Sequence, residues 1–127
     1  MTEARLSKLE IQIMETLWTK SEASIREMQD AFPAKKRPGY TTVQTMVYRM
    51  EAKQLVRRVR KVGHVHMFAA TVTRDAAQRR LVDDLLAMFG GQSRPVVSHL
   101  IDAGKLTLDD VEFAEKTLKQ LKKGGAV

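Results

Sequence analysis

The side chains best suited to chemistry in this chain are cations, and they gather in one stretch. Between Lys35 and Lys61 lie nine Lys or Arg residues and a single acidic residue, Glu51. Ammonium and guanidinium groups bind phosphates, and arginine can also recognise the edge of a guanine base in a DNA groove. Threonine, glutamine and tyrosine side chains stand among these cations. The mixture predicts a surface that binds a polyanion, and nucleic acid fits it better than anionic lipid.

An amphipathic helix over Tyr40 to Lys53 should carry the polar part of this surface. At about 100° per residue, one arc of the helix is apolar and the opposite arc is polar. Small hydroxyl groups allow a helix to approach DNA closely, while longer side chains reach base edges or phosphates. An ordinary solvated helix face is the alternative interpretation. The apolar arc holds Val43, Met46, Val47 and Met50, and the polar arc holds Thr41, Thr42, Gln44, Thr45, Tyr48 and Arg49.

A basic β-hairpin is predicted directly after this helix. Leu55 to Val62 is rich in β-branched residues, Gly63 permits a tight turn, and His64 to Ala69 returns as a second strand. Such a hairpin is called a wing. Together with the cationic loop before the helix, it completes the predicted DNA-binding set, which is Lys35, Lys36, Arg37, Thr41, Thr42, Gln44, Thr45, Tyr48, Arg49, Arg57, Arg58, Arg60, Lys61 and His64.

Two short helices should support the third. Ser7 and Glu10, and then Ser24 and Glu27, have the spacing of capping boxes that begin helices. The first helix carries an apolar stripe, and the second ends before Pro33. The fold predicted for residues 1–72 is therefore a winged helix-turn-helix DNA-binding domain with a small β-hairpin wing, in a mainly α protein. The stripe of the first helix is Leu9, Ile13, Met14, Leu17 and Trp18.

Residues 73–127 are predicted to form a second, helical domain. Helices are expected from Arg74 to Phe89, from Pro95 to Ala103, and after a cap at Thr107. Three short helices carry more apolar positions than so small a unit can bury, which favours pairing with a second copy. Packing back onto the first domain as a monomer is the alternative. The predicted dimerisation residues are Leu81, Leu85, Leu86, Phe89, Val97, Leu100, Ile101, Val111 and Leu118.

Composition narrows the class of protein further. The 127 residues carry a net charge of +7, with 13 basic and 7 acidic side chains in residues 1–72, so the positive charge belongs to the first domain. The absence of cysteine excludes disulfides and thiolate metal sites. No apolar run approaches the roughly 20 residues that span a bilayer, and no signal peptide is recognisable at the N-terminus. These features predict a cytoplasmic protein without a membrane partner.

The sequence offers little that could support catalysis or a cofactor. His64 and His66 would point to one side of a strand, but no third ligand stands with them in a metal-binding motif, so no metal is predicted and a phosphate contact is favoured. Asp109 and Asp110 fit the start of a helix better than a catalytic pair. No nucleophile motif, P-loop or dinucleotide fingerprint occurs. We therefore predict a protein that is not an enzyme and has no cofactor.

The two most characteristic strings are LSKLEIQIMETLW from Leu6 to Trp18 and TTVQTMVYRMEAKQLV from Thr41 to Val56. With them the whole chain resembles the penicillinase repressor family, which includes β-lactamase, methicillin-resistance and copper-responsive repressors. The resemblance implies a dimeric winged helix repressor with an N-terminal DNA-binding domain and a C-terminal dimerisation domain. It implies DNA contact by Thr41, Thr42, Thr45 and Arg49. It also implies a sensor protease as a further partner, acting on the C-terminal domain.

The chain departs from the family at places that concern the inducing signal and the wing. Where the β-lactam branch has a cleaved Asn-Phe bond, this sequence reads Ser98-His99-Leu100-Ile101. The cysteine-rich metal site of the copper branch cannot be built without cysteine. The hairpin has Gly63-His64, one aromatic residue at Phe68, and Ala70, where the family usually has Gly-Arg, several aromatic residues and a closing proline.

The function predicted from the sequence is that of a homodimeric transcriptional repressor that binds a palindromic DNA operator. The third helix would enter the major groove and the wing would follow the flanking backbone. Two alternatives remain open at this point. One is a ligand-sensing regulator with an effector site between its domains, and the other is a protein-interaction adaptor without sequence-specific DNA binding.

Overall fold

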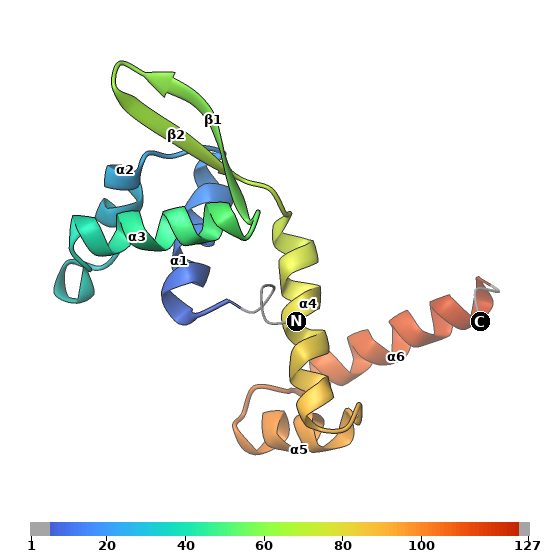
Figure 1. Ribbon diagram of the computed structural model, residues 1–127. Helices are drawn as coiled ribbons and strands as arrows, with labels where there is room; N and C mark the ends of the chain where they lie inside the picture. The colour runs from blue at the N-terminus through green and yellow to red at the C-terminus, as the bar shows by residue number, and fades with distance from the viewer. Residues whose placement is uncertain (1–5, 125–127) are drawn as a thin grey trace. The chain divides into compact units, whose positions relative to one another are not determined.

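The computed structural model describes residues 6–124, which form six α-helices and one two-stranded antiparallel sheet (Figure 1). The predicted mainly helical fold, a winged helix followed by C-terminal helices, is confirmed. The two compact units of the chain divide between Val82 and Asp83, inside a helix. The functional division at residue 72 remains a prediction. The elements are α1 (Lys8–Lys20), α2 (Ile25–Asp30), the 3-10 turn η1 (Ala34–Lys36), α3 (Tyr40–Ala52), β1 (Val56–Val62), β2 (Val65–Ala70), α4 (Arg74–Met88), α5 (Arg94–Asp102) and α6 (Leu108–Lys123).

Both predicted capping boxes at the start of the chain are present. The Ser7 hydroxyl accepts from the Glu10 amide and the Glu10 carboxylate accepts from the Ser7 amide, and Ser24 and Glu27 repeat this pair at α2. Helix α1 buries Ile13, Met14 and Leu17. The assignment of Leu9 to the buried stripe was wrong: its side chain is 38% exposed, because it lies in the first turn, at the edge of the core. The caps thus fix where both supporting helices begin.

Helix α3 separates its two faces as the sequence pattern predicts. Val43, Val47 and Met50 are fully buried, and Met46 packs against the core from the edge. The core beneath them is formed by apolar side chains from all three helices and the hairpin. It comprises Ile13, Met14, Leu17, Ala23, Ile25, Met28, Phe32, Val43, Val47, Met50, Val56 and Phe68.

The hairpin is attached to the helices through backbone as well as side-chain contacts. Val62 pairs with Val65 across a turn at Gly63, whose φ of 63° lies in the left-handed region that suits glycine. A bulge interrupts the register between Arg58 and Arg60. Ala23 and Phe68 exchange two backbone hydrogen bonds of 2.9 Å, so the loop after α1 adds a short bridge to β2. The base of the wing is therefore fixed to the three-helix core.

Trp18 connects α1 to the segment that follows the hairpin. Its indole Nε1 donates to the carbonyl of Val72 at 2.9 Å, and the Arg74 guanidinium lies 5.6 Å from the ring centroid. Arg74 also pairs with Glu15 at 2.9 Å. The ring is partly buried against the core. Trp18 thus has a structural role, and it anchors the chain where it leaves β2 for α4.

The second unit consists of the end of α4 together with α5 and α6. Gly90 and Gly91 adopt left-handed φ values of 66° and 81°, and the Gly91 amide donates to the Leu86 carbonyl at 2.8 Å, which ends α4. Thr107 and Asp110 form a third capping box that begins α6. No residue among 83–124 is buried. Each helix of this unit therefore carries apolar side chains that lack a complete apolar environment.

Candidate nucleic-acid interface

The outer face of α3 consists of small and extended polar side chains that form no side-chain hydrogen bond or ion pair within residues 6–124. Thr41, Thr42 and Thr45 are exposed, as is Arg49 near the end of the helix. Arg49 makes no ion pair with any part of the chain that the structure describes. The buried residues on the opposite face hold the helix in place. These four residues lie on a single exposed face, as predicted.

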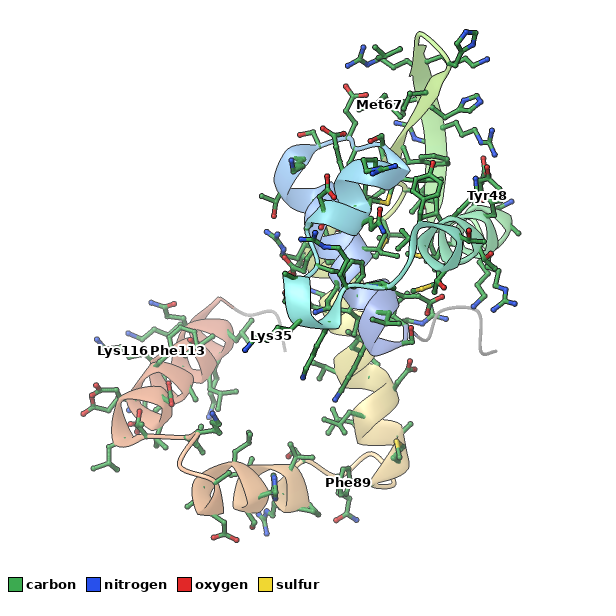
Figure 2. All side chains as sticks on the ribbon, turned by 90° about the vertical axis from the view of Figure 1, so that its left-hand side faces the viewer. Lys35, Tyr48, Met67, Phe89, Phe113 and Lys116 are labelled. Atoms are coloured by element: carbon green, nitrogen blue, oxygen red, sulfur yellow. The ribbon has the colours of Figure 1, made fainter. Side chains whose placement is uncertain are left out.

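A second edge of α3 faces the hairpin. Tyr40, Gln44 and Tyr48 recur at intervals of four residues and therefore share one side of the helix. The Gln44 amide donates to the Tyr48 hydroxyl at 3.3 Å. Tyr48 is 43% exposed and lies on the side of α3 next to the hairpin (Figure 2). The polar residues of α3 thus divide between an outer face and an edge that meets the wing.

Arg58 connects that edge to the hairpin. Its Nε donates to Glu51 Oε2 at 2.9 Å and its Nη2 to Oε1 at 3.3 Å. The guanidinium also lies 5.3 Å from the ring centroid of Tyr48 and 5.4 Å from that of Phe68. The hydrogen bond and charge of Glu51 raise the pKa of the Arg58 guanidinium above its ordinary value. This predicted DNA-binding residue therefore joins β1 to α3.

Arg60 is paired in a similar way on another side of the hairpin. Its Nε donates to both carboxylate oxygens of Glu22, at 2.9 and 3.1 Å, and this interaction raises the pKa of Arg60. Glu22 lies in the loop between α1 and α2, one residue before the backbone bridge at Ala23. Arg57 and Lys61 are exposed and form no ion pair among the described residues. The hairpin thus carries two cations that brace it and two that remain open to solvent.

The loop before α3 shows the same division. Arg37 donates through Nη2 to the carbonyls of Asp30 and Phe32, both at 2.9 Å, and so holds the loop against the end of α2. Lys35 and Lys36 lie in the 3-10 turn η1 and are exposed. Their ammonium groups are available to a ligand, whereas the Arg37 guanidinium has a structural role in the unbound protein.

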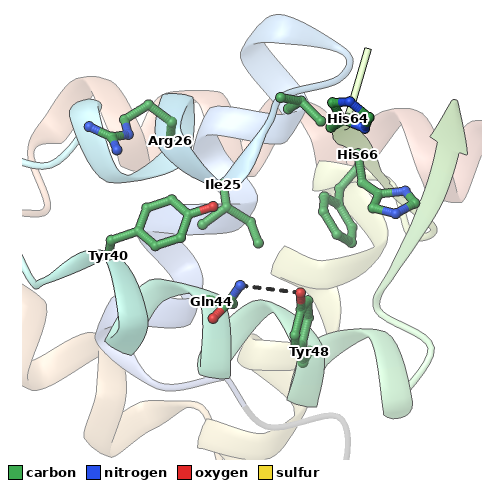
Figure 3. A pocket seen from close by; sticks show the side chains of 9 residues that line it. Ile25, Arg26, Tyr40, Gln44, Tyr48, His64 and His66 are labelled. Carbon is green, nitrogen blue, oxygen red and sulfur yellow. Dashed lines mark hydrogen bonds between the residues drawn. The ribbon is translucent and has the colours of Figure 1, made fainter. Parts of the chain in front are cut away.

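A cleft of about 330 Å³ lies between α2, α3 and the hairpin (Figure 3). It brings together Gln44, Tyr48 and His64, three of the predicted DNA-binding residues. His64 lies in the turn before β2 instead of within the strand, yet it and His66 both line the cleft. Sequence reasoning considered His66 only as the neighbour of His64, and it missed the lining residues Arg26 and Tyr40. The four-residue spacing from Tyr40 to Gln44 could have revealed Tyr40, but nothing in the sequence places Arg26 beside α3.

The described residues offer no alternative chemistry at this surface. No group of three or more His, Cys, Asp or Glu side chains within residues 6–124 is placed to hold a metal ion. None of the helices in that range is both long and apolar enough to cross a membrane. What the arrangement offers is a set of hydrogen-bond donors and cations spread over α3, the hairpin and η1.

Three helices followed by a basic hairpin, with the third helix exposing a polar face beside that hairpin, define a winged helix-turn-helix protein. The chain belongs to the penicillinase repressor family, whose sequence profile matches residues 6–120. It is 28% identical over 123 residues to the transcriptional regulator BlaI of Mycobacterium tuberculosis, in strain CDC 1551 / Oshkosh and again in strain ATCC 25618 / H37Rv. The match covers 94% of this chain and 87% of the relative. The predicted family is confirmed, and the chain is a transcriptional repressor by family.

We expect the Arg58–Glu51 contact to couple the wing energetically to α3. In a double-mutant cycle with Arg58→Gln and Glu51→Gln, the coupling free energy of unfolding should be about 1 kcal/mol, which is at the upper end for partly exposed ion pairs. We expect this value because the ion pair is bidentate and the guanidinium lies against two aromatic rings. Urea denaturation measures it. The matched control is Lys53–Glu10, a single contact of 3.8 Å, which should give less than about 0.5 kcal/mol. Equal coupling in both pairs would contradict the special role of Arg58.

Proposed function

We propose that the protein is a homodimeric repressor that binds a palindromic DNA operator, with α3 of each copy in the major groove and each wing along the flanking backbone. The observation that carries this proposal is the exposed outer face of α3, with Thr41, Thr42, Thr45 and Arg49, beside a basic hairpin. An α-helix fits the major groove, where each base pair presents a distinct pattern of donors and acceptors. Membership of a repressor family supports the same conclusion.

Base recognition in this proposal belongs to α3. The Arg49 guanidinium, which has no internal ion pair in the described chain, can donate two parallel hydrogen bonds to guanine O6 and N7. The threonine hydroxyls donate to or accept from either bases or phosphates, and their methyl groups can contact thymine. Because these side chains are short, the backbone of α3 can lie deep in the groove. Gln44 and Tyr48 stand at the edge nearest the wing.

Backbone binding in this proposal belongs to the cations that the fold leaves exposed. Arg57 and Lys61 on β1, together with Lys35 and Lys36 in η1, have ammonium or guanidinium groups free to neutralise phosphates. Arg58, Arg60 and Arg37 are already engaged within the unit. They would contribute to the positive potential of the surface while holding the wing and the loop in position.

Dimerisation in this proposal belongs to the second unit. Most of the predicted dimerisation residues are exposed, namely Leu85, Phe89, Val97, Ile101, Val111 and Leu118. Two others in this unit, Leu86 and Leu100, are half-buried. The remaining one, Leu81, is also half-buried but lies in the first unit. The Leu118 side chain is 66% exposed on α6. A second copy would cover these apolar side chains, and a twofold dimer matches a palindromic operator. Linking two half-site contacts raises the affinity through effective concentration, and occupation of the operator would block transcription.

Substitutions on the outer face of α3 should weaken operator binding. Thr45→Ala or Arg49→Ala is expected to reduce the binding free energy by about 1 to 3 kcal/mol, because each removes a contact to a base edge. Fluorescence anisotropy with a duplex that the wild-type protein selects from random sequences measures this. Arg94→Ala, which removes an exposed arginine on α5, is the matched control and should bind normally. Unchanged binding in both α3 variants would refute the assignment. Failure of the wild type to bind any duplex would favour an adaptor.

Neutralising the exposed cations of the hairpin should affect all DNA sequences alike. Each phosphate contact contributes about 0.9 to the slope of log K against log salt, so Arg57→Gln or Lys61→Gln should each lower the slope by about that amount for each copy of the dimer bound. Affinity for operator and random duplexes should fall together, which titrations at several salt concentrations will establish. A loss restricted to the operator, with the slope intact, would mean that these residues read bases.

A charge placed on the apolar face of the second unit should shift the protein toward monomer. Leu85→Asp or Leu118→Asp would bury an unpaired carboxylate in the proposed dimer interface, which is unfavourable. Sedimentation equilibrium should therefore detect a dimer in the wild type and a monomer at the same concentration in either variant. Gln12→Asp, which places the same charge on an exposed residue of α1 in the first unit, is the control and should remain dimeric. A dimer that resists both leucine substitutions would place the interface elsewhere.

A further inference from the structure

The cleft between α2, α3 and the hairpin combines several hydrogen-bond donors without an acidic side chain. Its polar lining consists of Arg26 from α2, Tyr40, Gln44 and Tyr48 from α3, and His64 and His66 from the hairpin. Figure 3 shows the two imidazoles on one side of the cleft and Arg26 with Tyr40 on the other. No Asp or Glu lines it. All these side chains can donate hydrogen bonds, so the cleft suits an anion.

Arg26 supplies a permanent positive charge at this cleft. Its guanidinium lies 5.3 Å from the ring centroid of Tyr40, which holds the side chain in place without neutralising it. It forms no ion pair with a carboxylate in residues 6–124. This contrasts with Arg58 and Arg60, each of which has a glutamate partner. The charge of Arg26 is thus available to a bound anion.

The position of the cleft indicates which anion it would meet. It lies between the two elements that the proposed function places on DNA, one in the major groove and the other along the flanking backbone. A sugar-phosphate strand borders each groove of a duplex, so a strand passing from α3 to the wing would cross the cleft. Phosphate oxygens accept hydrogen bonds from arginine, tyrosine and imidazolium groups.

The two histidines of the cleft would make phosphate binding there sensitive to pH. Imidazole changes charge between about pH 5 and 8. The groups that face the pair are Arg26 from α2, Tyr40 and Tyr48 from α3, and Lys61, which pairs with His66 on β1. None of these is acidic, so no lining side chain offers an imidazolium ion an ion pair. A phosphate in the cleft would supply the opposite charge and favour the protonated form.

We propose that this cleft binds a phosphate of the DNA strand that runs between α3 and the wing, and that His64 and His66 bind it as imidazolium ions. Binding of DNA therefore takes up protons, and the repressor holds DNA more tightly as the pH falls. Arg26 contributes to the same contact at every pH. This inference rests on the proposed DNA binding and adds to it a phosphate-binding site and regulation by the proton concentration.

The test compares DNA binding at pH 6 and pH 8 for the full chain. Wild-type affinity for a selected duplex should be about tenfold higher at pH 6 than at pH 8, which corresponds to an average uptake of about half a proton on binding across this range. The salt slope should be steeper at pH 6 by about 0.9 for each imidazole that becomes charged. In the His64→Gln/His66→Gln variant both differences should disappear. Arg26→Gln should lower the salt slope by about 0.9 for each bound copy, at both pH values.

The third histidine of the chain provides the matched control. His99→Gln, on α5, should keep the wild-type dependence on pH. If the double variant does not fold, judged by circular dichroism, His64→Gln alone changes only an exposed residue of the turn and should remove part of the dependence. A pH dependence that persists in the folded double variant, or its absence in the wild type, would overturn the proposal. Loss of the dependence in His99→Gln would overturn it as well.

Free phosphate is the other source of the same ligand chemistry. Inorganic phosphate can be titrated against the imidazole proton resonances of the full chain by nuclear magnetic resonance. Strong shifts of His64 and His66, combined with normal DNA binding by the double variant, would assign the cleft to a free phosphate and overturn the strand assignment. If the wild type binds no DNA at either pH, the proposed function itself fails, which is a different result from binding without pH dependence.

Discussion

The arrangement of the DNA-binding surface depends on the burial of Phe68. Its ring is 1% exposed and belongs to the core, while its backbone exchanges two hydrogen bonds with Ala23. The ring also lies beneath Arg58, which reaches Glu51 on α3. One residue of β2 thus contacts the loop after α1, the core, and Arg58, which is hydrogen-bonded to α3. Because a packed core deforms little, the wing keeps a fixed position relative to α3.

Positive charge in the first unit has two roles, and the difference lies in the position of the carboxylates. Glu51 and Glu22 each hold one arginine of β1, and backbone carbonyls hold Arg37. An ion pair on the surface adds little stability, but it fixes where a long side chain lies. The exposed cations that lack an ion pair among the described residues suit phosphate contacts, since such contacts depend mainly on charge. Arginines held by partners therefore define the shape of the surface, and in the proposed function the exposed cations supply its attraction for DNA.

Most of the fold follows from local signals, whereas the cleft does not. Local signals join residues only a few positions apart in sequence, and they include the capping boxes, the apolar arc of α3 and the glycine turn of the hairpin. The boundaries predicted from them agree with the structure to one or two residues. Arg26 and His66 are 40 residues apart in sequence and line one cleft, next to the place where Ala23 before α2 pairs with Phe68 of β2. No periodicity reports such a contact. The partners of Arg58 and Arg60 are hidden for the same reason, since a run of cations looks uniform in sequence.

The contrast between the two units explains why the chain needs both. The first unit has a complete core and can hold its surface rigid without help. The second has no buried residue within 83–124, and Phe113 on α6 is 70% exposed (Figure 2). Exposed apolar area on this scale is unfavourable in water, so it indicates an association site. In the proposed dimer, a rigid surface for reading DNA paired with an incomplete helical unit would make strong binding conditional on assembly, because one half-site alone offers only a single set of contacts.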